Sequence, residues 1–247
     1  MSKKVLAPTK AYLNVVNKES ITLKEARKDQ LLILDLNGTL VSRNRKNKSM
    51  YVRPYAQEFF DYVFENFTVM LWSSAQPHSV KYMSRIFRHR RDKLVAVWDR
   101  TSLDLSTRDF NRKSLTIKDL NKVWKHFDGK YDATNTILLD DSHQKTVLQP
   151  YNAIHPTEFE HHSTAFVSSG ESELLHVMEY LRAIQFQSNI AWYIKRHPYH
   201  NLPKNNEKNI YKLEFYRFAD NWENPPQIVD FTPVDNLLND FSSIQIK

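Results

Sequence analysis

Four short apolar runs alternate with segments of helical periodicity along most of the chain. The runs are residues 31–36, 67–72, 94–99 and 136–141. Their length suits strands, and their continuous apolar character is typical of strands buried on both faces. The helical patterns are residues 54–66, 78–88, 117–127 and 172–186. Strands that alternate with helices predict an α/β fold, in which a parallel sheet lies between two layers of helices.

The composition is that of a folded protein in a reducing compartment. The 247 residues are 41% hydrophobic, which supports a packed core. There is no cysteine, so disulfides, thiolate metal sites and cysteine nucleophiles are excluded. No apolar run reaches membrane-spanning length, and residues 1–14 lack the apolar block of a secretory signal. We expect an intracellular protein without membrane contact, nuclear or cytoplasmic, with a mitochondrial location as the alternative.

The net charge of +7 permits an acidic partner, such as nucleic acid or a phosphorylated protein segment. Many of the positive charges fall in two basic clusters. These are Arg43, Arg45, Lys46 and Lys48, and then Arg85, Arg88, Arg90, Arg91 and Lys93. One interpretation is nucleic-acid binding, and the other is that both clusters are solvated helix ends and loops.

Polar side chains follow three of the predicted strands where each strand ends. Together with a lysine early in the predicted helix 117–127, they are Asp35, Ser73, Ser74, Lys118, Asp140 and Asp141. Sites in parallel α/β sheets form beyond the carboxyl ends of strands, so we expect these groups to converge. The set suits phosphoryl transfer: Asp35 attacks phosphorus, a hydroxyl and Lys118 hold the anionic oxygens, and the acid pair holds Mg²⁺.

The first of these strand ends allows a second interpretation. Asn37 and Gly38 form the pair that favours a two-residue hairpin turn. A hairpin, however, requires alternating strands on both sides, whereas the segment before Asn37 is continuously apolar and the segment after Val41 becomes basic.

The motifs DLNGTL, VRPYAQEFFDYV, VMLWSSA, IKDL and ILLDDS, in this order over roughly residues 30–187, resemble the haloacid dehalogenase superfamily. More narrowly, they resemble phosphatases of the RNA polymerase II C-terminal domain, also called the NLI-interacting-factor-like domain. The resemblance implies a haloacid-dehalogenase-like three-layer sandwich without a large cap domain. It also implies an open site that takes protein segments, such as phosphoserine or phosphothreonine, and a Mg²⁺ cofactor.

The resemblance also implies a role for each matched residue. Asp35 matches the nucleophile, Ser73 the phosphoryl-binding hydroxyl and Lys118 the motif-three lysine. Ser74 replaces Ser73 if the register differs by one. Asp140 and Asp141 match the metal-binding acids, with Asp141 as the direct ligand.

Asn37 departs from the family pattern Asp-x-Asp-Gly-Thr. It matches the general acid/base, and its main-chain carbonyl matches a metal ligand. An amide transfers no proton, so turnover is expected to fall while phosphoryl and metal binding survive. Two hypotheses therefore remain: a slowed phosphoprotein phosphatase, and a catalytically inactive module that binds protein or RNA on a phosphatase fold.

The chain divides into three predicted parts. Residues 1–29 form an N-terminal extension, residues 30–189 the phosphatase-like domain, and residues 190–247 an extension rich in aromatic residues and proline. Prolines exclude one long helix from the last part. We expect it to wrap the core or to dock on a partner.

Overall fold

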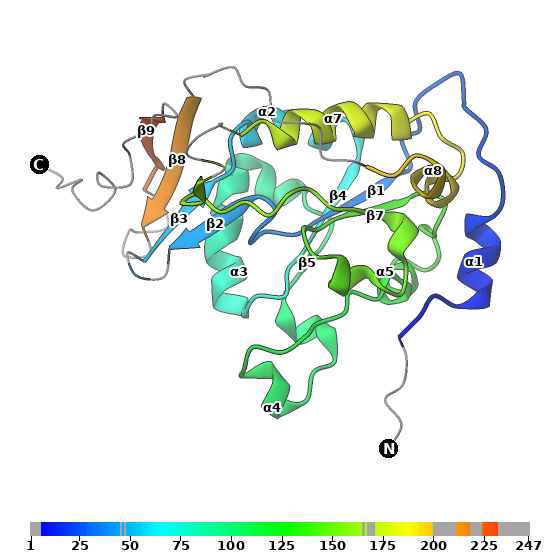
Figure 1. The fold of residues 1–247 in the computed structure, drawn as a ribbon, viewed down its shortest axis with the longest axis horizontal. Coiled ribbons are helices and arrows are strands. Elements are labelled where there is room, and N and C mark those ends of the chain that lie inside the picture. The colour runs from blue at the N-terminus through cyan, green and yellow to red at the C-terminus, as the bar shows by residue number, and fades with distance from the viewer. Residues whose placement is uncertain are drawn as a thin grey trace, which may run out of the picture.

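A five-stranded parallel sheet forms the centre of the computed structural model, with the order β5-β4-β1-β6-β7 (Figure 1). Its strands are β1 (Leu31–Leu34), β4 (Thr68–Trp72), β5 (Val97–Trp98), β6 (Thr136–Leu139) and β7 (Ala153–Ile154). Every neighbouring pair is parallel, so the α/β prediction is confirmed. The structure describes residues 6–44, 46, 48–164, 166, 171–199, 211–217 and 224–231.

The central strand β1 is buried on both faces, as its continuous apolar run predicts. Leu32 and Leu34 pack into a core with α2 (Ala56–Asn66) and α7 (Glu173–Ile184). Leu31 and Ile33 pack into a second core with α5 (Leu120–His126) on the opposite face. Successive side chains of a strand point to opposite faces, so a strand between two helical layers has to be apolar throughout. The three-layer sandwich is confirmed, and the described residues include no large cap domain.

The remaining helices are short. They are α1 (Lys10–Val16), α3 (Pro77–Met83), α4 (Thr107–Phe110) and α8 (Ile190–Arg196). Four segments form 3₁₀ helices: η1 (Ser84–Lys93), η2 (Arg100–Leu103), η3 (His143–Thr146) and η4 (Pro150–Asn152). Ala191 of α8 is fully buried against Tyr12 and Val16 of α1, so these two helices, far apart in the sequence, pack together.

A second, antiparallel sheet was not predicted from the sequence. Its order is β2-β3-β8-β9, formed by β2 (Val41–Asn44), β3 (Ser49–Val52), β8 (Tyr211–Arg217) and β9 (Gln227–Phe231). Strand β8 pairs with β3, with Tyr51 beside Phe215. The sheet lies at the left of Figure 1, beyond the carboxyl end of β1. Described residues of the predicted C-terminal extension therefore pack on the rest of the molecule, and docking of this extension on a partner stays a prediction.

Three predicted elements differ most in extent from the observed ones. The helix expected over 117–127 begins only at Leu120, because the Asp119 side chain caps it by accepting a bond from Asn121 N. Lys118 therefore precedes this helix, which corrects its predicted place. The helix over 78–88 ends at Met83, and 3₁₀ geometry follows with a break at Arg88 (φ 51°). The strand expected over 94–99 is shorter in the structure and consists only of β5. This is an edge strand, and its Val97 is 44% exposed.

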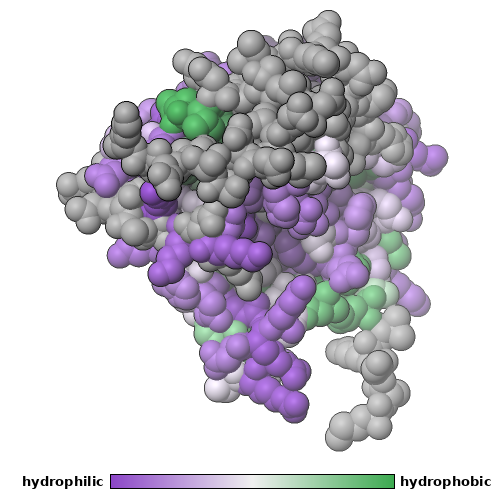
Figure 2. Space-filling model, turned by 60° about the vertical axis from the view of Figure 1, so that its left-hand side comes forward, coloured by the Kyte–Doolittle hydropathy of each residue, from purple (hydrophilic) through white to green (hydrophobic). Residues whose placement is uncertain are grey.

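The exposed surface is largely polar. Figure 2 shows mostly hydrophilic residues on one face, with separate small apolar areas. The exposed large apolar side chains are scattered along the chain, from Leu6 and Ile21 to Leu115 and Ile228. Among the described residues, no helix combines the length and the apolar character that crossing a bilayer requires.

Candidate active site

The loop after β1 places Asp35 at the carboxyl edge of the parallel sheet. Asp35 is 2% exposed, and its main-chain N–H donates to Leu139 O (2.9 Å), which continues the pairing with β6. The chain then turns tightly, because Leu36 O accepts bonds from Leu40 N (2.8 Å) and Val41 N (2.9 Å). Both neighbours of β1 are parallel strands. The hairpin interpretation is therefore wrong.

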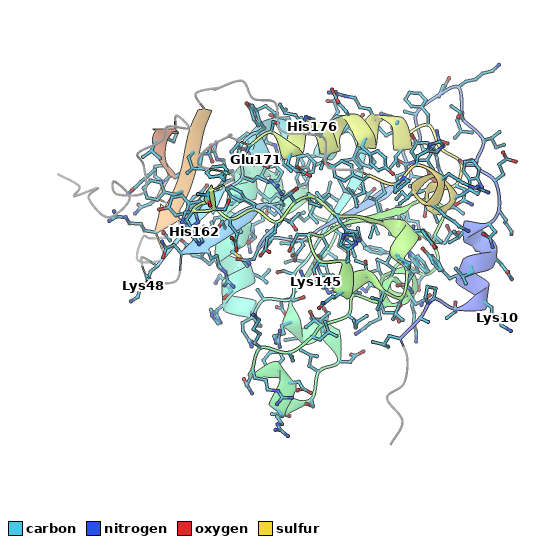
Figure 3. All side chains as sticks on the ribbon, in the orientation of Figure 1. Lys10, Lys48, Lys145, His162, Glu171 and His176 are labelled. Atoms are coloured by element: carbon cyan, nitrogen blue, oxygen red, sulfur yellow. The ribbon has the colours of Figure 1, made fainter. Side chains whose placement is uncertain are left out.

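Two lysines hold Asp35 and Asp140 together. Lys118 Nζ lies 3.0 Å from Asp35 Oδ1 and donates to Asp140 Oδ2 (2.6 Å). Lys145 Nζ donates to Asp35 Oδ2 (3.1 Å) and to Asp140 Oδ1 (2.9 Å). Each of the four carboxylate oxygens thus contacts one ammonium group. Lys145 lies in the middle of the molecule in Figure 3, whereas Lys10 and Lys48 lie at its outer limits.

These lysines determine the ionisation of Asp35. Burial alone would raise its pKa, but Lys118 and Lys145 outweigh this effect and lower the pKa of Asp35 to about 2. Conversely, Asp35, Asp140 and Asp141 together raise the pKa of Lys145 although burial opposes them. Asp35 is therefore a buried carboxylate that stays ionised at neutral pH, as a nucleophile requires.

Asp141 lies against the turn that follows Asp35. Thr39 Oγ1 donates to Asp141 Oδ1 (2.8 Å), and Asp141 N donates to Thr39 Oγ1 (3.1 Å). Gly38 has a φ of +89°, and a Cβ atom there would lie 2.9 Å from the Asp141 carboxylate. Glycine is thus required both by the backbone and by the close approach. Burial raises the pKa of Asp141 to about 6, and Asp35 and Asp140 act in the same direction.

The three carboxylates form a candidate metal site. Asp35, Asp140 and Asp141 each offer an oxygen within 4.8 Å of the others. Both oxygens of Asp140 are occupied by protein donors, since Ser142 N also donates to Asp140 Oδ1 (2.9 Å). Asp35 is likewise in contact with both lysines, so Asp141 is the one acid of the three without an ion pair among the described residues, and its oxygens suit a hard cation such as Mg²⁺. The donor chemistry fits Mg²⁺, although Lys145 shares Asp35.

Ser73 and Ser74 follow β4, the strand that pairs directly with β1. Ser73 is 2% exposed and its Oγ accepts a long bond from Ala75 N (3.4 Å). Ser74 Oγ is bonded to Thr116 Oγ1 (2.9 Å). Both hydroxyls are thus placed at the edge that holds Asp35, and among the described residues only the hydroxyl of Ser74 is bonded to another side chain. Its role as phosphoryl ligand remains a prediction.

Asn37 stands beside this cluster with its side chain held by Arg43. Arg43 Nε donates to Asn37 Oδ1 (2.9 Å), and Asn37 is half-buried. An amide oxygen accepts this bond as a carboxylate would, but it carries no exchangeable acid proton. The first basic cluster therefore contributes directly to the candidate site through Arg43.

Two members of the site were not predicted from the sequence. Lys145 follows Asp140 by five residues on η3, and Thr39 holds the Asp141 carboxylate. The sequence did contain a signal for Lys145, because it is a cationic residue a few positions after Asp140 and Asp141, where a predicted strand ends. None of the five motifs quoted above includes Lys145. Its contact with Asp35 depends on a turn in which Lys145 N donates to Ser142 O (3.1 Å).

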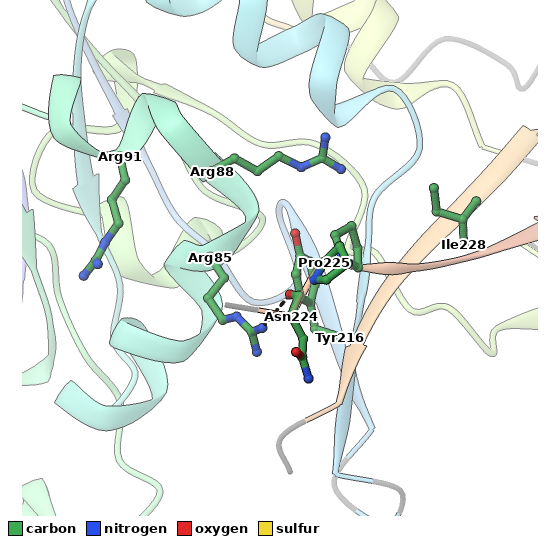
Figure 4. A pocket seen from close by; sticks show the side chains of 8 residues that line it. Arg85, Arg88, Arg91, Tyr216, Asn224, Pro225 and Ile228 are labelled. Carbon is green, nitrogen blue, oxygen red and sulfur yellow. Dashed lines mark hydrogen bonds between the residues drawn. The ribbon is translucent and has the colours of Figure 1, made fainter. Parts of the chain in front are cut away.

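The second basic cluster has mostly internal partners. Arg85 is buried, donates to Asn224 O (3.0 Å) and lies 4.9 Å from the Tyr216 ring, as Figure 4 shows from close by. Arg88 pairs with Glu214 (2.8 Å), and buried Arg90 pairs with Asp61. These arginines connect η1 to β8 and to α2. Simple solvation does not describe the buried Arg85 and Arg90, and nucleic-acid binding by this cluster stays a prediction. Arg45 of the first cluster lies outside the described residues.

A cavity of about 650 Å³ lies next to the acid cluster. It is lined by residues of η3, η4, β7 and α8, including His143, Tyr151, His155 and Tyr199. His155 Nδ1 donates to Asp140 O (2.7 Å), which joins the cavity wall to the strand end that carries the acids.

The chain is similar in sequence to several known proteins. The chain is 37% identical over 205 residues to an FCP1 homology domain-containing protein of Schizosaccharomyces pombe, covering 75% of this chain and 84% of the relative. It is 25% identical to the ubiquitin-like domain-containing CTD phosphatase 1 of Drosophila melanogaster, covering 81% of this chain and 58% of that protein. The chain spans about half the length of several other such CTD phosphatases.

A solved structure of Fcp1, described as an essential RNA polymerase II CTD phosphatase, aligns with a TM-score of 0.42 at 14% identity. The alignment covers 74% of this chain and 59% of that structure. The family model described as NLI interacting factor-like phosphatase matches residues 30–191. The chain belongs to the NLI interacting factor-like phosphatase family.

Proposed function

We propose that this chain binds a phosphorylated protein segment at Asp35 with Mg²⁺ and turns it over slowly. The observation that carries the proposal is the ionised, buried Asp35 held between Lys118 and Lys145, beside Asp141. A carboxylate fixed at the carboxyl edge of a parallel sheet suits in-line attack on phosphorus. Phosphoserine or phosphothreonine is the proposed substrate, since relatives are named CTD phosphatases.

In the proposed reaction, one Asp35 oxygen forms a bond to phosphorus while the bond from phosphorus to the leaving oxygen breaks. The ammonium of Lys118 and the hydroxyl of Ser73, with Ser74 as its neighbour, stabilise the anionic oxygens. Mg²⁺ would be held by Asp35, Asp141 and the Asn37 carbonyl, with Asp140 orienting the lysines. When bound, it would neutralise phosphoryl charge. Water then hydrolyses the aspartyl phosphate and regenerates Asp35.

Asn37 limits both halves of this cycle. The leaving oxygen needs a proton in the first half, and the attacking water has to lose one in the second half. The Asn37 amide neither gives a proton to the leaving oxygen nor takes one from the water, so hydrolysis of the aspartyl phosphate should be slow. An aryl phosphate needs little protonation of its leaving group, and the phosphorylated protein should then accumulate.

The test is to incubate the protein with an aryl phosphate and Mg²⁺, quench with acid and measure the intact mass. We expect the added mass of one phosphoryl group, mapped to the peptide that contains Asp35. Asp35→Asn is the control and should show no added mass. Turnover at ordinary phosphatase rates without an accumulated form would contradict the account of Asn37. Absence of both labelling and turnover would contradict the enzymatic proposal.

A second candidate is a phosphoryl-binding module without turnover. It is favoured by Asn37 and by the second ammonium at the acid cluster, Lys145. This candidate predicts binding of Mg²⁺ and a phosphate analogue such as beryllofluoride, with no aspartyl phosphate formed. A nuclear location follows from the names of the relatives as a proposal. The division at residues 29 and 189 and nucleic-acid contact through exposed Lys46, Lys48 and Lys93 also remain predictions.

A further inference from the structure

Lys145 occupies the solvent-facing side of the Asp35–Asp140 pair. Its side chain is 16% exposed, whereas that of Lys118, which bridges the same two carboxylates, is fully buried. Lys118 is therefore the inner counter-ion, and Lys145 lies between the acids and solvent. On that side Asp35 Oδ2 accepts a bond from Lys145 Nζ at 3.1 Å, so this ammonium occupies an oxygen of the candidate metal site.

The charges at the cluster are almost balanced without a metal ion. Asp35, Asp140 and Asp141 carry three negative charges when ionised, and Lys118 and Lys145 carry two positive charges. These five groups retain one net negative charge, which the guanidinium of Arg43 beside Asn37 offsets. An Asp at position 37 and no lysine at position 145 would leave two net negative charges at the site. Divalent cations bind through attraction to such clusters, so each compensating charge weakens their binding.

We propose that Lys145 is a resident cation that competes with Mg²⁺ for Asp35 and has to be displaced before the metal ion binds. The inference rests on the metal site of the proposed function. Displacement is feasible because the Lys145 backbone is anchored while its side chain is long and flexible. Lys145 O accepts a bond from Lys118 N (2.8 Å), and Lys145 N donates to Ser142 O (3.1 Å). Only the ammonium end needs to move.

The test is the affinity for Mn²⁺, used as a Mg²⁺ probe, measured by calorimetry on the wild type and on Lys145→Met. Removal of the competing charge should lower the Kd for Mn²⁺ by about tenfold or more, because an ammonium in contact with a ligand oxygen is lost. Lys122→Met is the matched control. Lys122 also pairs with one aspartate, Asp104 (2.8 Å), but on the surface. The Kd of the Lys122→Met variant for Mn²⁺ should equal that of the wild type.

Thermal melting provides a second readout. In EDTA, Lys145→Met should melt below the wild type, because Asp35 and Asp140 then share a single ammonium. Mg²⁺ should raise the melting temperature of the variant more than that of the wild type. An unchanged or weaker Mn²⁺ affinity in Lys145→Met would overturn the inference. Such a result would also cover the case in which Lys145 and the metal ion bind a phosphoryl group side by side and do not compete.

A wild-type crystal soaked in Mn²⁺ decides the question if Lys145→Met does not fold. Anomalous density at Asp35 with Lys145 moved away, or no density with Lys145 in place, supports competition. Density at Asp35 with Lys145 still bound to it overturns competition. None of these readouts depends on phosphoryl transfer. Failure to label Asp35 would therefore remove the proposed enzymatic function without affecting this inference, and equal Mn²⁺ affinities would remove this inference alone.

Discussion

Arg43 Nε donates a 2.9 Å hydrogen bond to Asn37 Oδ1, so a guanidinium group holds the one residue that departs from the family motif. A carboxyl group placed at position 37 would meet the same guanidinium. An adjacent positive charge favours the ionised form and lowers the pKa of a carboxyl group. Arg43 would therefore favour the base role of such a carboxyl group over its acid role.

Asn37→Asp should raise the turnover of an aryl phosphate by about 10²–10⁴-fold, the range for a positioned acid/base. The gain should appear mainly in hydrolysis of the aspartyl phosphate, the step that uses the base. Burst kinetics separate this step from attack by Asp35. Asp35→Asn should abolish turnover in either background. If Asn37→Asp gives no gain while Mn²⁺ and beryllofluoride still bind, the binding-module candidate is preferred.

Gly38→Ala should disrupt the metal site. A Cβ at Gly38 would lie 2.9 Å from the Asp141 carboxylate, so the carboxylate has to shift. Gly129→Ala is the matched control, because Gly129 also has positive φ (+75°) but no atom within 4 Å of the added Cβ. Both variants should lose about 1–2 kcal/mol of stability from the left-handed backbone. Only Gly38→Ala should also weaken Mn²⁺ binding, as measured by calorimetry, and equal Mn²⁺ affinities would contradict the close approach.

Arg53→Lys should be strongly destabilising. The buried guanidinium donates to Thr39 O (2.9 Å), Thr157 O (2.8 Å) and Glu171 Oε1 (2.9 Å). A lysine ammonium cannot reproduce this planar fork, and Glu171 is left buried without its full partner. We expect a loss of about 3–5 kcal/mol in urea unfolding, as for other broken buried pairs.

Arg112→Lys is the comparison for Arg53. Arg112 pairs with Asp109 within one turn, and both side chains are substantially exposed. Its substitution should cost less than about 1 kcal/mol. Similar losses in the two variants would show that the Arg53 network contributes little.

His161 should make stability sensitive to acid. Burial, with a contribution from His162, lowers its pKa to about 4. His161 Nδ1 is bonded to Ser42 Oγ (2.8 Å), and its ring stacks on Tyr51 with centroids 4.0 Å apart. Because the folded-state pKa lies below the unfolded value of 6.5, the contribution is present above pH 6.5. It is lost as the pH falls towards 4.

His161→Phe keeps the stacked ring and removes the titration. Between pH 6.5 and 4 the wild type should lose roughly 1–3 kcal/mol more stability than this variant, which urea unfolding at each pH measures. His78→Gln changes an exposed histidine and should follow the wild type. Parallel pH profiles for the wild type and His161→Phe would show that His161 does not titrate in this window.

The parallel sheet and most of its polar edge were predictable because local patterns determine them. Leu31 to Leu34 are apolar in succession since both faces of β1 are covered, and Asp35 follows where the strand ends. The place of Lys118 was predicted less well, because the cap at Asp119 decides where α5 begins.

Lys145 and β8 depend on long-range geometry. The contact of Lys145 with Asp35 joins residues 110 positions apart. Leu213 and Phe215 of β8 are buried and Glu214 between them is less so, but the next residue, Tyr216, is also buried, so strict alternation is lost. The sequence does not specify which strand lies beside it, because the partner Tyr51 is far away in the chain.

The pairing of Tyr51 with Phe215 also sets an order of events during synthesis. A nascent chain leaves the ribosome N-terminus first, so β1, β4, β6 and β7 all emerge before β8. The α/β core, with Asp35 and its two lysines, can then form while β3 still lacks its outer neighbour. Until β8 arrives, β3 presents an open row of backbone N–H and C=O groups, the kind of edge that pairs with other chains. A chaperone that protects nascent chains would be needed most in this interval, after the acid cluster has assembled and before the second sheet closes.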